Sequence, residues 1–204
     1  CLIGRNFCRG HSIGERLEPY RLHWLEDVTA CDDYAGLARV TQRLVTPIAG
    51  GEYVYGLTPF RHMLEARSVD IVMIDLVRVG GITQWMKVAA LAEAFNLPVV
   101  SHLIPEVHLH LVAAVPTGEI VEYMPWTRLL FEDPPLPEKG MLTVPAAPGL
   151  GLIASLIMGF NSGLGSNGSN IKSGAGMFSG LGLPIMPAPL SDTACRSPGC
   201  DCGP

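Results

Sequence analysis

Charged residues are scarce in this sequence, and long hydrophobic runs are missing. Only 16% of the 204 residues are charged, and a net charge of −5 argues against the basic surface with which proteins bind nucleic acid. No apolar stretch approaches the ~18 residues that cross a membrane, since Gly151 and Gly159 interrupt the longest one. The chain is nevertheless 48% hydrophobic, which is enough to form a core. We therefore expect a globular protein that has neither nucleic acid nor a membrane as its main partner.

Cysteine pairs at the spacing of a zinc site are missing too. The segment CRSPGCDC has no second pair or histidines near it. The six cysteines lie at the two ends and in one loop, at Cys1, Cys8, Cys31, Cys195, Cys200 and Cys202. This distribution is typical of free thiols, so we expect a cytoplasmic protein.

Between residue 14 and about residue 150, apolar runs of strand length alternate with segments of helical pattern. The strand-like runs are 22–27, 47–52, 70–75, 97–102 and 120–124. Helices are expected at 34–44, 60–66, 82–96 and 106–115. Nearly continuous apolar strands between amphipathic helices predict an α/β fold with a parallel sheet that is covered by helices.

The helix boundaries have their own signals. Asp32 or Asp33 is expected to cap the first of these helices, and Thr58-Pro59 to start the second. The third is expected to bury one face, made of Ile82, Trp85, Met86, Ala89, Ala92 and Phe95.

Two segments depart from this alternation. Residues 1–13 show no clear periodicity, and residues 153–204 hold 10 of the 23 glycines but only four charged side chains. Such glycine- and serine-rich sequence does not bury enough apolar surface to order itself. We therefore expect an atypical N-terminal segment (1–13), a folded part (14–152) and a flexible, disordered tail (153–204).

Five polar residues recur in step with the strand-like runs, at intervals of 26, 23, 27 and 20 residues. They are Glu26, Glu52, Asp75, His102 and Glu122, and at least the first four close a run. One strand, one helix and two loops take roughly 25–30 residues in a (β/α) barrel, whose active sites lie at the C-terminal ends of the strands. The series therefore predicts a barrel active site, with about five of the eight strands present.

The residue types indicate the chemistry. Carboxylates that converge on a barrel axis suit Mg²⁺, which can stabilise the enediolate formed when the proton α to a substrate carboxylate is removed. His102 is expected to be the base, with its tautomer fixed by Asp75 on the neighbouring strand. Glu122 is expected to donate a hydrogen bond to the enediolate oxygen if burial raises its pKa.

The motifs WLED, PIAGGE, VDIVMIDLVRVGGIT, VVSHLIPEVHLHL and VPAAPGLGL resemble the mandelate racemase subgroup of the enolase superfamily, over roughly residues 14–152. The likeness is closest to its acid-sugar dehydratases, such as the talarate/galactarate dehydratases. The resemblance implies a (β/α)₇β barrel of which this is the C-terminal part, and a homo-oligomer in intact family members. It also implies that Glu26 and Glu52 are the second and third magnesium ligands, that Asp75 and His102 form the catalytic dyad, and that Glu122 is the electrophilic acid.

The departures from the family pattern lie upstream. The family's first magnesium ligand, an aspartate, would fall at or before the start of this chain, and its Lys-x-Lys pair is absent. Arg78 stands where subgroup members often carry a basic residue. Two roles stay open for it: a source of positive field at the site, or a solvated loop arginine. His108 and His110 are expected to be packing or surface residues. We expect a truncated chain with little activity alone.

The leading hypothesis is thus part of an Mg²⁺-dependent dehydratase that converts an acid sugar to a 2-keto-3-deoxy acid. One alternative is a racemase or epimerase of a 2-hydroxy acid, which adds a lysine on the opposite face of the substrate. The other is a non-catalytic pseudoenzyme fragment, because an incomplete barrel leaves two sheet edges open.

Overall fold

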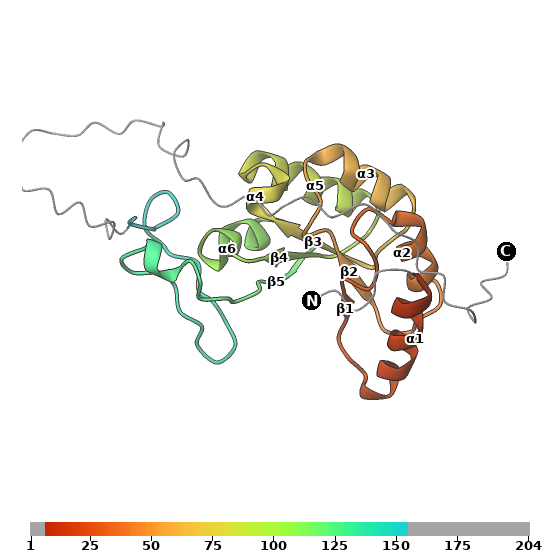
Figure 1. Cartoon of the computed structure of the whole chain (residues 1–204). Coiled ribbons are helices and arrows are strands. Elements are labelled where there is room, and N and C mark those ends of the chain that lie inside the picture. The colour runs from red at the N-terminus through yellow and green to blue at the C-terminus, as the bar shows by residue number, and fades with distance from the viewer. Residues whose placement is uncertain (1–6, 155–204) are drawn as a thin grey trace, which may run out of the picture. The chain divides into compact units, whose positions relative to one another are not determined.

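The computed structural model describes residues 7–154, in which strands and helices alternate (Figure 1). The strands are β1 (Leu25–Glu26), β2 (Ile48–Gly50), β3 (Ile71–Asp75), β4 (Val99–His102) and β5 (Gly118–Ile120). The helices are α1 (Phe7–Leu17), α2 (Tyr34–Thr41), α3 (Leu57–Glu65), α4 (Leu76–Val79), α5 (Ile82–Ala94) and α6 (Pro105–Ala114), with 3₁₀ turns η1 (Glu18–Tyr20) and η2 (Arg128–Leu130). The predicted α/β class is confirmed.

The five strands form one parallel sheet in chain order, β1-β2-β3-β4-β5. Parallel neighbours need a crossover connection, which the intervening helices supply. Asp75, the last residue of β3, pairs in register with His102, the last residue of β4. Sequential parallel strands of this kind are the architecture of a (β/α) barrel, and the sheet is consistent with part of one.

Alternation along the strands divides their side chains between two faces. Figure 1 shows α2, α3 and α5 along one side of the sheet, and strand residues such as Val72 and Ile74 join the helices in the main core. The other face carries a smaller buried cluster of Ala49, Ile71, Met73 and Val100, against which Trp24 packs. Asp75 and His102 are in step with Met73 and Val100, so their side chains belong to this second face.

Helix α1 occupies a region where we expected no periodic structure, and it crosses the boundary expected after residue 13. Gly10 and Gly14 lower its helix propensity. Both glycines are needed for packing: a Cβ on Gly10 would lie 2.1 Å from the Val28 carbonyl oxygen, and one on Gly14 would lie 2.3 Å from Leu44 Cδ1. Gly10 and Gly14 thus lower the helix propensity of this segment but allow the close packing of α1.

Some expected element boundaries are correct and others are wrong. Asp33 caps α2, since its Oδ1 accepts the Gly36 N–H at 2.8 Å. Helix α3 begins at Leu57 rather than at Pro59, because Gly56, with a φ of 70°, turns the chain earlier. Strand β5 was expected at 120–124 but ends at Ile120, because its pairing with β4 already begins at Gly118 and includes a register shift.

The buried face of α5 also differs from the expected one. Trp85, Ala89 and Ala92 are buried as predicted, whereas Ile82 and Phe95 at the two ends are 44% and 39% exposed. The ends of a helix extend past the sheet that its middle covers, and periodicity does not show where that cover stops.

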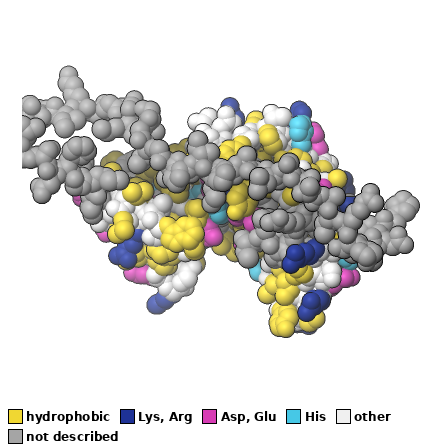
Figure 2. All heavy atoms as spheres, in the orientation of Figure 1, with side chains coloured by type: hydrophobic (Ala, Val, Ile, Leu, Met, Phe, Trp, Pro, Cys, Tyr) yellow, Lys and Arg dark blue, Asp and Glu magenta, His cyan; other side chains and the backbone are white. Residues whose placement is uncertain are grey.

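After β5, residues 121–154 add no further strand to the sheet. Their regular structure in this part of the chain is the short 3₁₀ turn η2. This segment exposes several large hydrophobic side chains, and Figure 2 shows such side chains beside charged ones. They include Trp126, Leu129, Leu130 and Met141. The segment is tied back to α6 by a hydrogen bond of 2.7 Å from Thr127 Oγ1 to the buried carboxylate of Glu106.

Cys8 is disulfide-bonded, which corrects the expectation that all cysteines are free thiols, while Cys31 is free and exposed. Pairing depends on proximity in space, which spacing in the sequence does not give. Among the described residues, no helix combines the length and apolarity needed to cross a membrane. The expectation of a flexible tail concerns residues that lie, except for 153 and 154, outside the described part.

Candidate functional site

The five predicted site residues all lie at or just beyond the C-terminal ends of successive strands. Glu26, Asp75 and His102 are the last residues of β1, β3 and β4, whereas Glu52 and Glu122 lie two residues past β2 and β5. Since the strands are parallel, these ends share one edge of the sheet. The structure therefore places all five at the same end.

Asp75 and His102 are in direct contact. His102 Nδ1 lies 2.7 Å from Asp75 Oδ2, and the two side chains are 12% and 5% exposed. A carboxylate only accepts hydrogen bonds, so the imidazole carries its proton on Nδ1 and directs Nε2 away from Asp75. The contact expected between the two residues is present, and their catalytic roles stay a prediction.

Asp75 is held by its own helix as well. Its Oδ1 caps α4, accepting the N–H groups of Val77 at 2.8 Å and Arg78 at 2.7 Å, and the Arg78 guanidinium lies 3.7 Å from Oδ2. Burial alone would raise the pKa of Asp75, but the hydrogen bond from His102 and the contacts with Arg78 outweigh it and lower that pKa. Asp75 is thus a stable anion that fixes the imidazole.

The second nitrogen of His102 faces Glu52. His102 Nε2 lies 3.4 Å from Glu52 Oε2, so the imidazole spans two carboxylates. Burial lowers the pKa of His102, but the hydrogen bond to Asp75 and the charges of Glu52, Asp75 and Glu122 outweigh it, so the net pKa is raised. His102 can therefore both hold and release a proton at Nε2, the function of a general acid or base.

Glu122 reaches His102 through the backbone on either side of it. The Glu122 N–H donates to Ser101 Oγ at 2.9 Å, and Glu122 Oε2 accepts the N–H of Leu103 at 2.7 Å. The predicted acid is therefore engaged as a hydrogen-bond acceptor next to His102.

The carboxylates on β1 and β2 form a more negative region. Glu26 Oε2 accepts the indole N–H of Trp24 at 3.2 Å. Burial raises the pKa of Glu52, and the charges of Asp27 and Glu26 raise it further, although His102 opposes them. Burial also raises the pKa of Asp27.

Carboxylate oxygens are ligands that Mg²⁺ prefers, and a positive charge would stabilise the ionised Glu52, whose pKa is raised by burial and by the charges of Asp27 and Glu26. Glu26 and Glu52 would hold the ion. Within residues 7–154, however, no group of three or more His, Cys, Asp or Glu side chains is arranged to bind a metal. Magnesium binding by Glu26 and Glu52 therefore stays a prediction.

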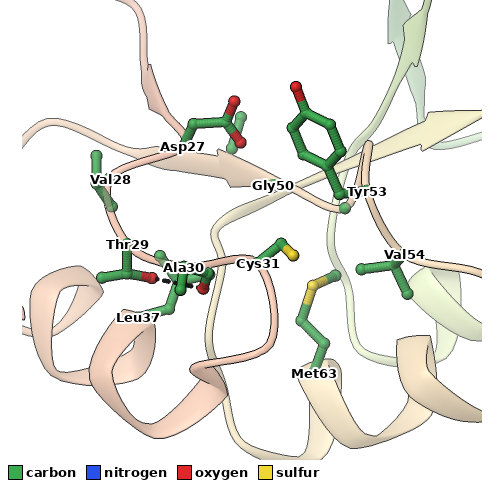
Figure 3. A pocket seen from close by; sticks show the side chains of 12 residues that line it. Asp27, Val28, Thr29, Ala30, Cys31, Leu37, Gly50, Tyr53, Val54 and Met63 are labelled. Atoms are coloured by element: carbon green, nitrogen blue, oxygen red, sulfur yellow. Dashed lines mark hydrogen bonds between the residues drawn. The ribbon is translucent and has the colours of Figure 1, made fainter. Parts of the chain in front are cut away.

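A small pocket of about 20 Å³ lies beside this region, and Figure 3 shows the polar ends of Asp27 and Tyr53 pointing the same way, away from Met63. Pockets that bind small molecules usually measure ~300–1,000 Å³. This one is too small for an acid sugar.

Sequence reasoning missed three contributors to the site. Tyr53 places its ring 4.5 Å from the Arg78 guanidinium carbon, Asp27 adds to the charge around Glu52, and Ser101 accepts the Glu122 N–H. Each is adjacent in sequence to a predicted residue, but only the fold shows which neighbour turns toward the site. Arg78 also donates to the Glu52 carbonyl oxygen at 3.1 Å, which favours an organising role over a solvated loop arginine.

Comparison with known proteins identifies the fold. Residues 10–154 match the family described as Enolase C-terminal domain-like. The D-xylonate dehydratase of Haloferax volcanii is 35% identical over 153 residues, which cover 71% of this chain and 37% of that protein. The 3,6-anhydro-alpha-L-galactonate cycloisomerase of Streptomyces coelicolor is 34% identical over 138 residues, which cover 67% and 38% of the two chains.

A solved relative agrees. The L-talarate dehydratase from Polaromonas sp. JS666, complexed with Mg and L-glucarate, superposes with a TM-score of 0.71 at 35% identity, covering 74% of this chain and 42% of that one. The chain thus spans less than half the length of these relatives. Since the family pattern extends over most of the sequence and the relatives share both fold and identity, the chain belongs to the enolase C-terminal domain-like family.

Proposed function

We propose that this chain carries the proton-transfer half of a magnesium-dependent acid-sugar dehydratase. The observation behind the proposal is the hydrogen bond of 2.7 Å between His102 Nδ1 and Asp75 Oδ2, which leaves Nε2 directed toward the strand-end carboxylate Glu52. The names of the relatives support the substrate class, since they include a D-xylonate dehydratase and an L-talarate dehydratase complexed with L-glucarate.

In this proposal His102 Nε2 removes the proton α to the substrate carboxylate. The resulting imidazolium is stabilised by Asp75, and it returns the proton to the departing β-hydroxyl, which leaves as water. The enol that remains becomes a 2-keto-3-deoxy acid. Glu122 Oε2 accepts the Leu103 N–H, so its other oxygen would have to carry a proton to donate a hydrogen bond to the developing oxyanion. Bound Mg²⁺ would supply positive charge at the substrate carboxylate.

Dehydration is proposed ahead of racemisation because the names of the relatives include several dehydratases, among them a D-xylonate dehydratase and an L-talarate/galactarate dehydratase. Racemisation would add a second base on the opposite face of the substrate. The lysines of residues 7–154, Lys87 on α5 and Lys139 after η2, are both exposed and do not stand at strand ends.

The 204-residue chain alone is proposed to have negligible turnover. Glu26 and Glu52 provide two carboxylates, and Mg²⁺ dehydrates reluctantly, so two ligands without further support bind it weakly. Even losing a group that only orients a metal ligand typically costs about 10–100-fold in affinity or activity.

The test compares this chain with a chimera in which the upstream part of the Polaromonas L-talarate dehydratase precedes it. Both are assayed with D-xylonate, L-talarate and galactarate for 2-keto product, and in D₂O for loss of the α-proton signal. We expect activity in the chimera, abolished by His102→Asn and retained by His110→Asn on the same helix–strand unit. Dehydration that survives His102→Asn would refute the assignment of the base, and fast turnover by the 204-residue chain would refute the incomplete metal site.

If a folded chimera that binds Mg²⁺ neither dehydrates these acids nor exchanges their α-proton, the non-catalytic alternative gains support. The dyad would then be a structural ion pair, because such pairs also perturb pKa values in proteins without activity.

A further inference from the structure

The turn that follows His102 has an unfavourable backbone. Leu103 and Ile104 are both left-handed, with φ angles of 55° and 42°. Residues other than glycine rarely adopt this conformation, and a β-branched residue such as isoleucine does so least readily. Two such residues in succession persist only where surrounding contacts hold them.

Both polar backbone groups of Leu103 are held by side chains. Its N–H donates to Glu122 Oε2 at 2.7 Å, and its carbonyl oxygen accepts a hydrogen bond from His108 Nδ1 at 2.6 Å. The two side chains come from different elements, the segment after β5 and helix α6. The turn is therefore clamped from two directions.

His108 is suited to this single contact. It is fully buried, and burial lowers its pKa, so the ring is neutral. A neutral imidazole carries one N–H, and only a donor satisfies the Leu103 carbonyl, so the proton lies on Nδ1. Nε2 has no hydrogen-bond partner in the described part, and the ring packs against buried Trp85 at a centroid distance of 6.0 Å.

Glu122 holds the other side of His102 as well. Its N–H donates to the hydroxyl of Ser101, which is buried, while its carboxylate accepts the N–H of Leu103. The residues before and after His102 are thus both tied to Glu122. The backbone position of His102 is fixed on each side.

We propose that His108, together with Glu122, is a positioning residue that holds the strained Leu103–Ile104 turn and thereby keeps the His102 imidazole against Asp75. The inference rests on the proposed function only in giving His102 a catalytic role. Neither the contacts of Leu103 nor the hydrogen bond between His102 and Asp75 requires a substrate, so the clamp is testable without activity.

The test uses proton NMR of the full chain to follow the Nδ1 proton that His102 shares with Asp75. His108→Phe keeps an aromatic ring but removes the donor, and we expect that proton to exchange with solvent roughly tenfold faster. His108→Asn offers a side-chain N–H close to the position of Nδ1, and we expect it to restore slow exchange. If the His108 ring served only for packing, His108→Phe would keep the slow exchange and His108→Asn would lose it.

The matched control is His110→Phe. His110 lies on the same helix and its Nε2 also contacts a backbone carbonyl, that of Leu150 at 2.9 Å, but it does not touch the turn. We expect its substitution to leave the exchange of the His102 proton unchanged. Equal exchange rates in wild type and His108→Phe would overturn the proposal.

A second pair of variants serves if His108→Phe does not fold. Glu122→Gln keeps an oxygen that accepts the Leu103 N–H, whereas Glu122→Leu removes it. The proposal requires faster exchange of the His102 proton in Glu122→Leu than in Glu122→Gln, and equal rates would overturn it. If dehydratase activity is never found while these exchange rates behave as stated, the proposed function fails and the clamp remains.

Discussion

On β3 and β4 the ionisable side chains pair with opposite partners, whereas on β1 and β2 negative groups crowd together. Asp75 receives hydrogen bonds from His102 and from the backbone of α4, and its pKa is lowered. Glu52 lies where Asp27 and Glu26 add to the effect of burial, and its pKa is raised. The groups on β3 and β4 are stabilised by contacts within the fold, whereas the charge of Glu52 is disfavoured overall despite its contact with His102. The contrast supports the proposed division between proton transfer on β3 and β4 and metal binding on β1 and β2.

Asp75→Asn is expected to have the largest effect. The amide oxygen can still cap α4, but the charge that favours protonated His102 is lost. The pKa of His102 should fall, because burial then has less opposition, and the free energy of unfolding should fall by about 1.5–3 kcal/mol, the value of a hydrogen bond to a charged group. NMR titration of His102 and urea unfolding measure the two quantities.

Asp70→Asn makes the same chemical change at the other end of the sheet, where Asp70 Oδ2 accepts the Ile48 N–H at 2.9 Å. It should leave the pKa of His102 unchanged. If Asp75→Asn also leaves that pKa unchanged, then Asp75 does not stabilise protonated His102, and our account of the pair on β3 and β4 is wrong.

Glu52→Gln is expected to have a smaller effect of opposite sign. At neutral pH and without metal, removing this charge should relieve its burial and its repulsion by Asp27, and should stabilise the chain by about 0.5–1 kcal/mol despite the lost contact with His102. Millimolar Mg²⁺ should raise the melting temperature of wild type but not of Glu52→Gln, because a ligand stabilises only the form that binds it. A destabilised Glu52→Gln would show that the carboxylate half is already balanced.

The two halves should also respond differently to pH. The pKa of His102 is raised above 6.5, so its contribution to stability is complete below that pH and is lost as the pH rises through the folded-state value. The pKa of Asp75 is lowered below 3.8, so its contribution is complete above that pH and is lost only on stronger acidification. The pKa of Glu52 is raised above 4.5, so the folded state holds this proton more tightly than the unfolded state does. Stability therefore falls as the pH rises from 4.5 toward the folded-state pKa of Glu52.

Melting temperatures of wild type, His102→Asn and Glu52→Gln from pH 4 to 9 separate these contributions. The decline above pH 6.5 should disappear in His102→Asn and persist in Glu52→Gln. A decline that persists unchanged in His102→Asn would assign it to another group.

The strand-end residues could be predicted from the sequence because strand length and barrel repeat length are local properties. Asp75 closes an uninterrupted apolar run, and β3 ends at that residue. Helix α1 could not be predicted, because Gly10 and Gly14 reduce local helix propensity for the sake of contacts with Val28 and Leu44, which lie far along the chain.

The clamp on Leu103 was beyond sequence reasoning for the same reason. His108 follows helical spacing on α6, and nothing local shows that its ring reaches the Leu103 carbonyl rather than the apolar core. Of the two expected roles, surface or packing, the structure shows packing, since His108 is fully buried. The hydrogen bond depends on the left-handed turn at Leu103–Ile104.

Arg78 joins the two halves, and its removal is expected to have the smallest effect. Its guanidinium donates to the Glu52 carbonyl oxygen at 3.1 Å, lies 3.7 Å from Asp75 Oδ2 and covers the Tyr53 ring. Because the group is partly exposed, Arg78→Met should reduce the free energy of unfolding by only about 0.5–1 kcal/mol. Arg78→Lys should recover part of this loss, since it keeps the charge but lacks the planar fork.

A double-mutant cycle with Tyr53→Leu should give a coupling energy of about 0.5 kcal/mol. Arg61→Met is the matched control, because Arg61 forms an exposed ion pair with Glu65 at 3.6 Å. Removing this pair should change the free energy of unfolding by close to zero. If Arg78→Met is as neutral as Arg61→Met, then Arg78 does not connect the two halves. The opposite pKa shifts of Asp75 and Glu52 would in that case arise within each half separately, from His102 on one side and from Asp27 and burial on the other.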